Sequence, residues 1–330
     1  MPVKNICTKT IKGKKPIVKP MVCTKCGAKA IYKNQGQFFC KDHFLDYFET
    51  KVFKTIKKFK LFEKGDNICV ATSGGKDSLA VLYMTMLYCK KYNIDFFALC
   101  IDEGIAGYRD HTVEDLTTFC NKYDIKFHVL SFKDQFGIGL DEMTNKAINE
   151  HNKKPCTVCG IFRRKLLNKG ARDLKATKLV TGHNLDDETQ SILMNQFLGN
   201  AQHNASMGPI TGLSKNNKFV PRVKPLYIIT EKETRLFCLL RGFEVHFTEC
   251  PNIHLSFRSQ VRDKINDIET VLPGAKYGVV NSFLEILPLL KKHYKNTNTT
   301  KNKNFKLCIK CGEPCSGEIC NACKLESELC

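Results

Sequence analysis

The sequence predicts an α/β protein: a parallel sheet of about five strands with helices on both faces, flanked at each end of the chain by a cysteine-rich module. Five short apolar runs are typical of buried strands: 68–72, 96–101, 126–130, 178–181 and 243–247. The helical stretches around them are 77–91, 110–123, 161–174, 186–198 and 231–241. Because apolar strands alternate with helices, we expect parallel pairing and a sheet covered on both faces.

Composition limits the class of protein. The chain has 330 residues and no run of eighteen uncharged apolar residues, so we expect no membrane span. The N-terminus is basic but lacks the apolar segment of a secretory signal, which favours a cytoplasmic location. In that reducing compartment, 18 cysteines indicate metal binding or chemistry rather than disulfides. The net charge of +19, of which +12 lies within 1–64, favours nucleic acid as a partner.

The pattern changes along the chain divide it into segments. Residues 45–64 are predicted to form an amphipathic helix with lysines on its polar face, and 256–293 a final helical stretch. The expected organisation is a disordered basic tail (1–20), an N-terminal zinc module plus basic helix (21–64), a catalytic domain (65–293), a linker (294–306) and a C-terminal zinc module (307–330).

Each terminal module has the spacing of a structural zinc site. The first set is Cys23, Cys26, Cys40 and His43, and the second is Cys308, Cys311, Cys320 and Cys323. Two paired ligands on one tight turn and two on another complete a tetrahedron around Zn²⁺. Four protein ligands leave no open position, so both sites are predicted to be structural. Cys315 and Cys330 fall outside this spacing.

The stretch "SGGKDS", residues 73–78, follows the first predicted strand and opens a helix. Its backbone N–H groups and the positive helix end predict an anion site, to which Ser73, Ser78 and Lys76 add donors and charge. Gly74 and Gly75 allow the backbone to approach a phosphate. A Walker A loop is excluded because Val70 stands where the first glycine is needed and Asp77 follows the lysine.

This stretch resembles the PP-loop of the ATP pyrophosphatases, which cleave ATP between its α- and β-phosphates. A second shared element is "TGHNLDDETQ", 181–190, where Gly182, His183 and Asp187 match nucleotide-site positions. Both elements follow strands, and open α/β sheets bind ligands at the carboxyl ends of their strands. Amidotransferase synthetases and the tRNA lysidine-forming enzymes share such motifs, but their chemistry does not explain the cysteines in the middle of the chain.

Those cysteines are Cys156 and Cys159 of "KPCTVCG" and Cys250 of "TECPN". We expect all three at one edge of the sheet near the nucleotide, and no fourth ligand is evident. Three interpretations remain open: a 4Fe–4S cluster held by three cysteines, a CxxC pair that carries a persulfide, and a third zinc that would need another ligand.

The order of zinc module, PP-loop, CxxC, distal cysteine and second zinc module resembles that of the TtuA-type tRNA 2-thiolation enzymes over 21–330. The resemblance implies a 4Fe–4S cluster on Cys156, Cys159 and Cys250, whose free iron would bind the sulfur. It implies ATP contacts at Ser73–Ser78, near Ile101 and Asp102, and at Arg163, Gly182 and Asp187. It also implies tRNA and a sulfur donor as partners, the donor being a ubiquitin-like thiocarboxylate carrier or free sulfide, and a homodimer.

The chemistry accounts for the ATP site, since adenylation converts the uridine C2 oxygen into a leaving group. Lys76 and the loop would stabilise pyrophosphate, and Asp77 or Asp187 would bind Mg²⁺, while Asp187 could instead orient or deprotonate a reacting group. The asparagine-rich, cysteine-rich composition does not look thermophilic, which favours the wobble uridine over a T-loop uridine. The alternative class is a non-catalytic zinc-module RNA-binding protein.

Overall fold

The computed structural model describes residues 21–105, 107, 109–151, 154–213, 218–244, 257–300, 306–315 and 317–329. The chain divides into two compact units, the first ending at Tyr47 and the second running from Phe48 to the C-terminus. The basic tail expected over 1–20 lies outside the described residues, as do Cys250 and the linker residues 301–305.

The first unit contains a small antiparallel hairpin and the start of a helix. Its strands are β1 (Tyr32–Asn34) and β2 (Gln37–Phe39), and α1 spans Lys41–Lys58 across the division between the units. Tyr32, Phe39 and Tyr47 pack together with Phe44, which is fully buried. A unit this small has little other apolar surface to bury, which fits a need for metal.

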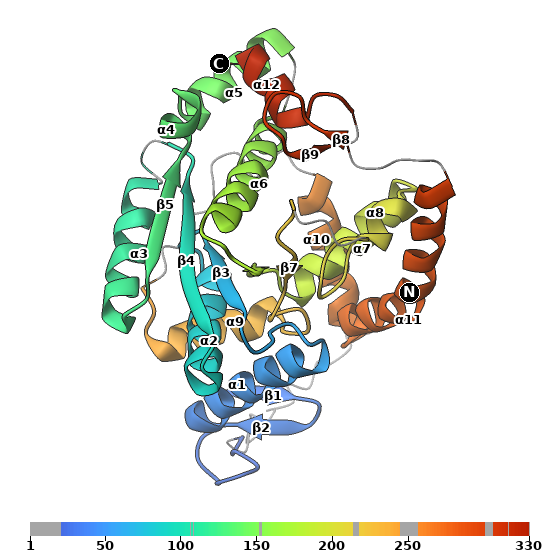
Figure 1. Ribbon diagram of the computed structural model, residues 1–330. Helices are drawn as coiled ribbons and strands as arrows, with labels where there is room; N and C mark the ends of the chain where they lie inside the picture. Colours follow the sequence, from blue (N-terminus) through green and yellow to red (C-terminus); the bar gives the residue numbers. More distant parts are fainter. Residues whose placement is uncertain are drawn as a thin grey trace, which may run out of the picture. The chain divides into compact units, whose positions relative to one another are not determined.

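The second unit is built on a five-stranded parallel sheet with strand order β5-β4-β3-β6-β7 (Figure 1). The strands are β3 (Asn67–Thr72), β4 (Asp95–Asp102), β5 (Phe127–Ser131), β6 (Lys178–Val180) and β7 (Arg222–Val223). The predicted α/β class with about five parallel strands is confirmed. The last strand was placed wrongly, since β7 is the fifth strand and 243–244 form none. The rest of the predicted run 243–247 lies outside the described residues.

Alternate side chains of the strands point to opposite faces, and each face is covered. The helices around the sheet are α2 (Lys76–Tyr92), α3 (Arg109–Tyr123), α6 (Pro155–Asp173), α7 (Leu185–Phe197) and α9 (Glu231–Arg241). On one face Leu99 packs with Ala171 of α6, and on the other Cys100 packs with Leu116 of α3. A Cβ atom at Gly170 would lie 2.6 Å from Leu130 Cδ1, so glycine allows α6 to lie close against the sheet.

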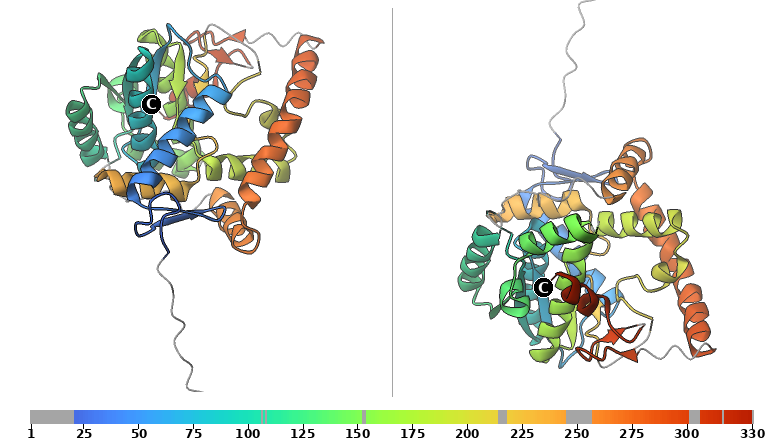
Figure 2. Two further views of the ribbon diagram at one scale, coloured as in Figure 1. Left: turned by 90° about the horizontal axis from the view of Figure 1, so that it is seen from below. Right: turned by 90° about the horizontal axis from the view of Figure 1, so that it is seen from above.

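The remaining elements extend the second unit. They are α4 (Phe132–Phe136), α5 (Leu140–His151), α8 (Ala201–Ala205), α10 (Phe257–Val271), α11 (Ala275–Thr300), β8 (Lys306–Leu307), β9 (Pro314–Cys315) and α12 (Asn321–Leu329). Helix α11 packs on α7 through Phe283, Leu287 and Ile192, and it lies at the opposite end of this unit from α3 (Figure 2). The predicted stretch 256–293 is therefore two helices, and 294–300, predicted as linker, continue α11. Among the described helices, none is long and apolar enough to cross a membrane.

Candidate functional site

Both cysteine-rich modules bring four ligand atoms together. In each set, Cys23–Cys26–Cys40–His43 and Cys308–Cys311–Cys320–Cys323, the four atoms lie within 4.8 Å of one another. The Cys26–Cys40 and Cys311–Cys320 sulfur pairs are 3.7 Å apart. That matches the edge of a tetrahedron with Zn–S bonds of about 2.3 Å. The donor atoms and their spacing therefore fit structural zinc at both ends of the chain.

The C-terminal module is anchored on α6. Leu325 and Leu329 of α12 join the buried cluster that contains Val158 and Phe162 of α6. Lys165 reaches from α6 to Glu326 at 2.9 Å and to the Cys323 sulfur at 3.7 Å. The charged Lys165 ammonium can donate to a zinc-bound thiolate, and such outer contacts orient metal ligands. The module thereby supports the helix that carries Cys156, Cys159, Arg163 and Arg164.

Replacing Cys308 by serine is expected to release the zinc of the C-terminal module and to lower the melting temperature by more than about 5 °C. The reason is that zinc in this module would hold the base of α12, which packs on α5 and α6, and a loss of a few kcal/mol lowers the melting temperature of a domain of this size by that much. Metal analysis and thermal unfolding provide the measurement. Cys315→Ser, outside the ligand set, is the matched control. Unchanged zinc content in Cys308→Ser would contradict the assignment.

The phosphate turn lies between β3 and α2, as the sequence predicted. Gly74 has φ of +78°, in the left-handed region that favours glycine, and Gly75 is the N-cap residue of α2. The Ser73 N–H donates to Ser78 Oγ at 3.1 Å, and the Ser78 hydroxyl donates to the Gly75 carbonyl at 2.8 Å. Helix α2 lacks a side-chain cap, so its first N–H groups remain available to an anion.

Gly182 brings the loop after β6 against the start of α2. A Cβ atom there would lie 2.9 Å from the backbone carbon and oxygen of Asp77, closer than such atoms approach. Only glycine therefore allows the two motifs to meet. The sequence placed both motifs at strand ends, and this contact is the physical link between them.

Gly182→Ala is consequently expected to displace the phosphate turn and weaken ATP binding at least about tenfold, while the protein stays folded. The sheet core does not depend on this position, whereas the turn geometry does. Calorimetric titration with a non-hydrolysable ATP analogue measures the effect. The control is Gly278→Ala in α11, where an added Cβ meets nothing within 4 Å. Equal affinity of Gly182→Ala and wild type would show that the turn tolerates displacement.

The two motifs and α6 enclose a cavity of about 420 Å³. Eight residues predicted to bind or act on the nucleotide line it: Ser73, Asp77, Ser78, Ile101, Arg163, Gly182, His183 and Asp187. Ala71, Thr72, Gly160, Arg164, Leu167, Thr181 and Arg222 line it as well. Four other predicted positions, Gly74, Gly75, Lys76 and Asp102, are not among its lining residues. The Asp102 carboxylate instead accepts a hydrogen bond from the Gly104 N–H at 2.8 Å.

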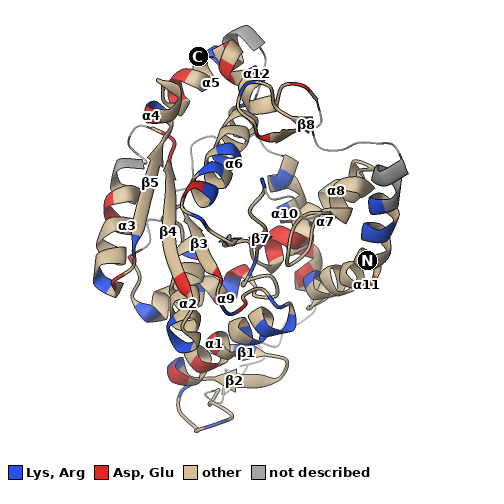
Figure 3. Cartoon of the chain, in the orientation of Figure 1, with Lys and Arg blue, Asp and Glu red and all other residues tan. Residues whose placement is uncertain are grey.

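Positive charge gathers on one side of this cavity. Figure 3 shows basic residues on α6 and β7, and Arg163, Arg164 and Arg222 line the cavity. Burial and the neighbouring Arg164 lower the pKa of Arg222 to about 10, and burial and Arg163 lower that of Arg164. Buried cations this close together repel each other. A polyanion that binds between them lowers the free energy by removing that repulsion.

His183 is held as a neutral ring. Burial, with the nearby cations Lys224 and Arg258, lowers its pKa to about 3. Its Nδ1 lies 2.8 Å from the Thr181 hydroxyl, which fixes the ring orientation. A neutral imidazole can position a nucleotide by hydrogen bonding or packing, but it adds no charge to the phosphate site.

Lys76 is paired within the protein. Its ammonium lies 3.0 Å from Asp77 Oδ2 and 2.8 Å from Glu231 Oε1 at the start of α9. Burial opposes the charge, yet Asp77 and Glu231 raise the pKa of Lys76 above its ordinary value. The lysine expected to stabilise pyrophosphate thus has two carboxylate partners to exchange for phosphate.

Asp187 occupies the third position of α7 in a reciprocal cap with Asn184. The Asn184 N–H donates to Asp187 Oδ2 at 3.2 Å, and the Asp187 N–H donates to Asn184 Oδ1 at 3.1 Å. Arg258 of α10 donates to Asp187 Oδ1 at 3.3 Å. Burial raises the pKa of Asp187 to about 6, against the opposing effect of Arg258. The carboxylate is therefore fixed in place, and its pKa is shifted toward neutral pH, as is often the case for groups that transfer protons.

The CxxC pair lies at the start of α6, which begins at Pro155 rather than at the predicted residue 161. Cys156 is exposed and Cys159 is half-buried, three residues apart on one face of the helix. Cys159 directly precedes Gly160, which lines the cavity, and lies near the Arg164 cation. A helix N-terminus and a nearby cation favour thiolates, so the two described thiols fit iron ligation. The third predicted ligand, Cys250, lies outside the described residues.

Four residues that line the cavity or contact Asp187 had no assigned role in the sequence: Arg164, Arg222, Arg258 and Asn184. Arg164 adjoins the predicted Arg163, and Asn184 lies within the second motif, so local context could have indicated both. Arg222 and Arg258 carry no such signal, because β7 has two residues and α10 lies far along the chain.

Together the parallel sheet, the glycine turn and the strand-end cavity define a PP-loop nucleotide-binding protein. The profile of the PP-loop domain matches residues 46–267. The tRNA 2-thiolation protein NcsA of Haloferax volcanii is 32% identical over 92% of this chain and 98% of its own length. The tRNA-5-methyluridine(54) 2-sulfurtransferase of Pyrococcus horikoshii is 34% identical over 92% of this chain and 93% of its own length.

A solved structure agrees. The U34-tRNA thiolase NcsA from Methanococcus maripaludis, determined with its 4Fe-4S cluster, matches with a TM-score of 0.77 at 32% identity. The match covers 94% of this chain and 96% of that chain. The chain belongs to the PP-loop family of tRNA 2-thiolation proteins, as its motifs predicted.

Proposed function

We propose that this chain is an ATP-dependent tRNA uridine 2-sulfurtransferase of the cytoplasm. One observation carries the proposal: a single cavity is lined by the phosphate turn, by Asp187 and by helix α6, which carries Cys156 and Cys159 near its start. This arrangement supports nucleotide activation and sulfur delivery at the same cavity. The names of the relatives, each a tRNA thiolation protein or sulfurtransferase, point to the same reaction.

The first half of the reaction is adenylation. The uridine O2 attacks the α-phosphorus of ATP, the bond to the bridging oxygen breaks, and pyrophosphate leaves. The N–H groups of the phosphate turn, the Ser73 and Ser78 hydroxyls and the cavity arginines stabilise the charge on pyrophosphate. Lys76 joins them by exchanging a carboxylate partner for phosphate. Asp77 lines the cavity and would be a ligand of Mg²⁺, which would neutralise part of the phosphate charge.

Adenylation at O2 also requires the uridine N3 proton to leave. Asp187 is the proposed acceptor, since its carboxylate lines the cavity and is held by Asn184 and Arg258. The proton returns to the ring when sulfide adds to C2, the C2–O bond breaks and AMP departs. Atoms and charge balance with one ATP and one sulfide consumed for each thiouridine, AMP and pyrophosphate formed.

Cys156, Cys159 and Cys250 are the proposed ligands of a 4Fe–4S cluster. Three thiolates would leave one iron with an open position for the sulfur that is transferred. The cluster in the Methanococcus maripaludis thiolase supports this choice over a persulfide on the CxxC pair. The sulfur donor is either free sulfide or a thiocarboxylated carrier, and the proposed assembly is a homodimer.

The RNA contacts are proposed from charge and substrate. The lysine-rich N-terminal segment would bind tRNA phosphates, and such binding weakens steeply with salt. Composition favours the wobble uridine. Thiolation of the T-loop serves heat tolerance, and hyperthermophile proteins tend to lose asparagine and cysteine, in which this chain is rich. The relatives divide between the two positions, since one is named for uridine 54 and another for U34.

The experiment that tests the function measures AMP and pyrophosphate release by the anaerobically purified chain with ATP, sulfide and a tRNA transcript. We expect release that depends on unmodified tRNA, with a pre-thiolated tRNA as the control. Binding of tRNA without AMP release would instead identify a non-catalytic RNA-binding protein. Mass spectrometry of tRNA from a deletion strain assigns the position, because loss of wobble 2-thiouridine supports the proposal and loss confined to the T-loop overturns it.

A further inference from the structure

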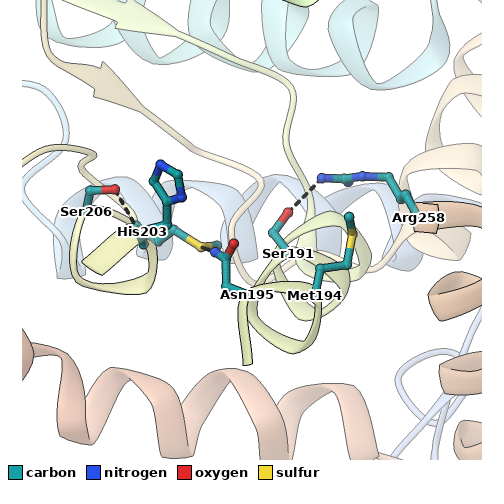
Figure 4. A pocket seen from close by; sticks show the side chains of 7 residues that line it. Ser191, Met194, Asn195, His203, Ser206 and Arg258 are labelled. Carbon is teal, nitrogen blue, oxygen red and sulfur yellow. Dashed lines mark hydrogen bonds between the residues drawn. The ribbon is translucent and has the colours of Figure 1, made fainter. Parts of the chain in front are cut away.

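A second cavity, of about 270 Å³, lies beside α7 and is lined in part by Arg258, the ion-pair partner of Asp187. Its lining residues are Ser191, Met194, Asn195, His203, Ser206, Met207 and Arg258. In Figure 4 the three side chains of α7 lie between Arg258 on one side and His203 and Ser206 on the other. The proposed reaction assigns this cavity no role.

The cavity is connected to the reaction site through one helix face. Asp187, Ser191 and Asn195 follow each other at four-residue spacing on α7, so they share a face. Arg258 joins the two sites, because it donates to Asp187 Oδ1 at 3.3 Å and to Ser191 Oγ at 2.8 Å. A group bound in the second cavity would therefore share Arg258 with the Asp187 carboxylate of the first cavity.

The lining offers the hydrogen bonds that the edge of a nucleobase needs. Asn195 donates its amide to Asn204 and Met207, and within the described residues its Oδ1 accepts nothing. His203 Nδ1 contacts Asn200 at 2.6 Å, and the described residues leave its Nε2 without a bond. The Ser191 hydroxyl accepts from Arg258 and keeps its own proton to donate. One acceptor and two donors thus remain for a ligand with alternating polar groups.

The rest of the lining suits an aromatic ring with a phosphate. Met194 and Met207 supply polarisable thioether surface that packs on flat rings. Arg258 supplies a guanidinium that can donate a further hydrogen bond to a phosphate oxygen. The volume is below the roughly 300–1,000 Å³ of sites for larger ligands, so one nucleotide fits better than a longer segment.

We propose that this cavity binds one unpaired nucleotide of the RNA substrate, next to the uridine that reacts. The reacting base must reach ATP in the first cavity, so the nucleotide in the second is a neighbour that fixes the register of the loop. Unstacked loop nucleotides are the usual target of base-specific recognition in RNA. The inference rests on the proposed function, since it requires tRNA as substrate.

The test combines abasic substitutions in the RNA loop that contains the reacting uridine with Met194→Ala and His203→Ala in the full chain. Each abasic tRNA is titrated against each protein. For wild type, we expect one neighbouring position at which loss of the base weakens binding roughly tenfold. At that position the two variants should weaken binding less than twofold further, because the base contact is already gone.

Val271→Ala, exposed at the end of α10 and outside the cavity, is the control and should keep the wild-type abasic profile. The affinity for ATP should be unchanged in all variants. Abasic effects that multiply independently with Met194→Ala and His203→Ala at every loop position would overturn the proposal. So would variants that lose affinity for a carrier protein instead of RNA. Absence of tRNA binding by wild type would contradict the proposed function itself, which separates the two failures.

Discussion

Replacing Asp187 by asparagine is expected to reduce tRNA-dependent pyrophosphate release by roughly 10²- to 10⁴-fold, the range in which a positioned acid or base contributes. The amide has nearly the same size and can still accept from the Asn184 N–H, so the helix cap of α7 survives. What disappears is the charge opposite Arg258 and the capacity to take a proton. The measurement is AMP and pyrophosphate release with saturating tRNA.

Asp102→Asn provides the matched control. Both aspartates were predicted at the ATP site, yet the Asp102 carboxylate binds the Gly104 N–H and does not line the cavity. We expect Asp102→Asn to change the rate less than tenfold, and both variants to bind tRNA like wild type. If Asp187→Asn forms AMP at the wild-type rate, Asp187 has no part in proton transfer or in binding the metal.

The strength of the sequence prediction followed the length of each element. The strands β3, β4 and β5 are five to eight residues long and apolar, so each stands out in the sequence as an apolar run. The ends of these strands were predicted to within about one residue. Strand β7 has two residues and owes its place to pairing with β6, which no local pattern encodes. For the same reason Arg222, which β7 brings to the cavity, received no predicted role.

Motifs predicted the site where chemistry and local structure coincide. Three residues of the phosphate turn line one cavity with His183 and Asp187, because the two motifs follow the neighbouring parallel strands β3 and β6. The three are Ser73, Asp77 and Ser78. The early start of α6 was missed because "KPCTVCG" was interpreted through its cysteines, although proline is favoured in the first turn of a helix. Contacts between distant segments, such as Arg258 with Asp187 and Glu231 with Lys76, depend on tertiary packing. The spacing of residues along the sequence does not predict them.

The cysteine pair gives the second large effect. Cys156→Ala and Cys159→Ala are each expected to yield colourless protein without bound iron and to abolish thiolation, because two thiolates hold an iron–sulfur cluster poorly. Adenylation should persist in part, since the phosphate turn and Asp187 are separate from these thiols in the chain. Cys250→Ala should behave in the same way if it is the third ligand.

Three readouts separate this prediction from general damage. Iron analysis and the visible spectrum report the cluster, zinc content reports the terminal modules, and pyrophosphate release reports the ATP site. Cys315→Ser, half-buried and outside both zinc ligand sets, should match wild type in all three. Cys159 lies one residue before Gly160 at the cavity wall and near the cationic Arg164. We therefore propose that a cluster held by this pair would deliver sulfur to an adenylated base in the cavity. Full thiolation by iron-free wild type would transfer that role from the cluster to a persulfide on the same pair.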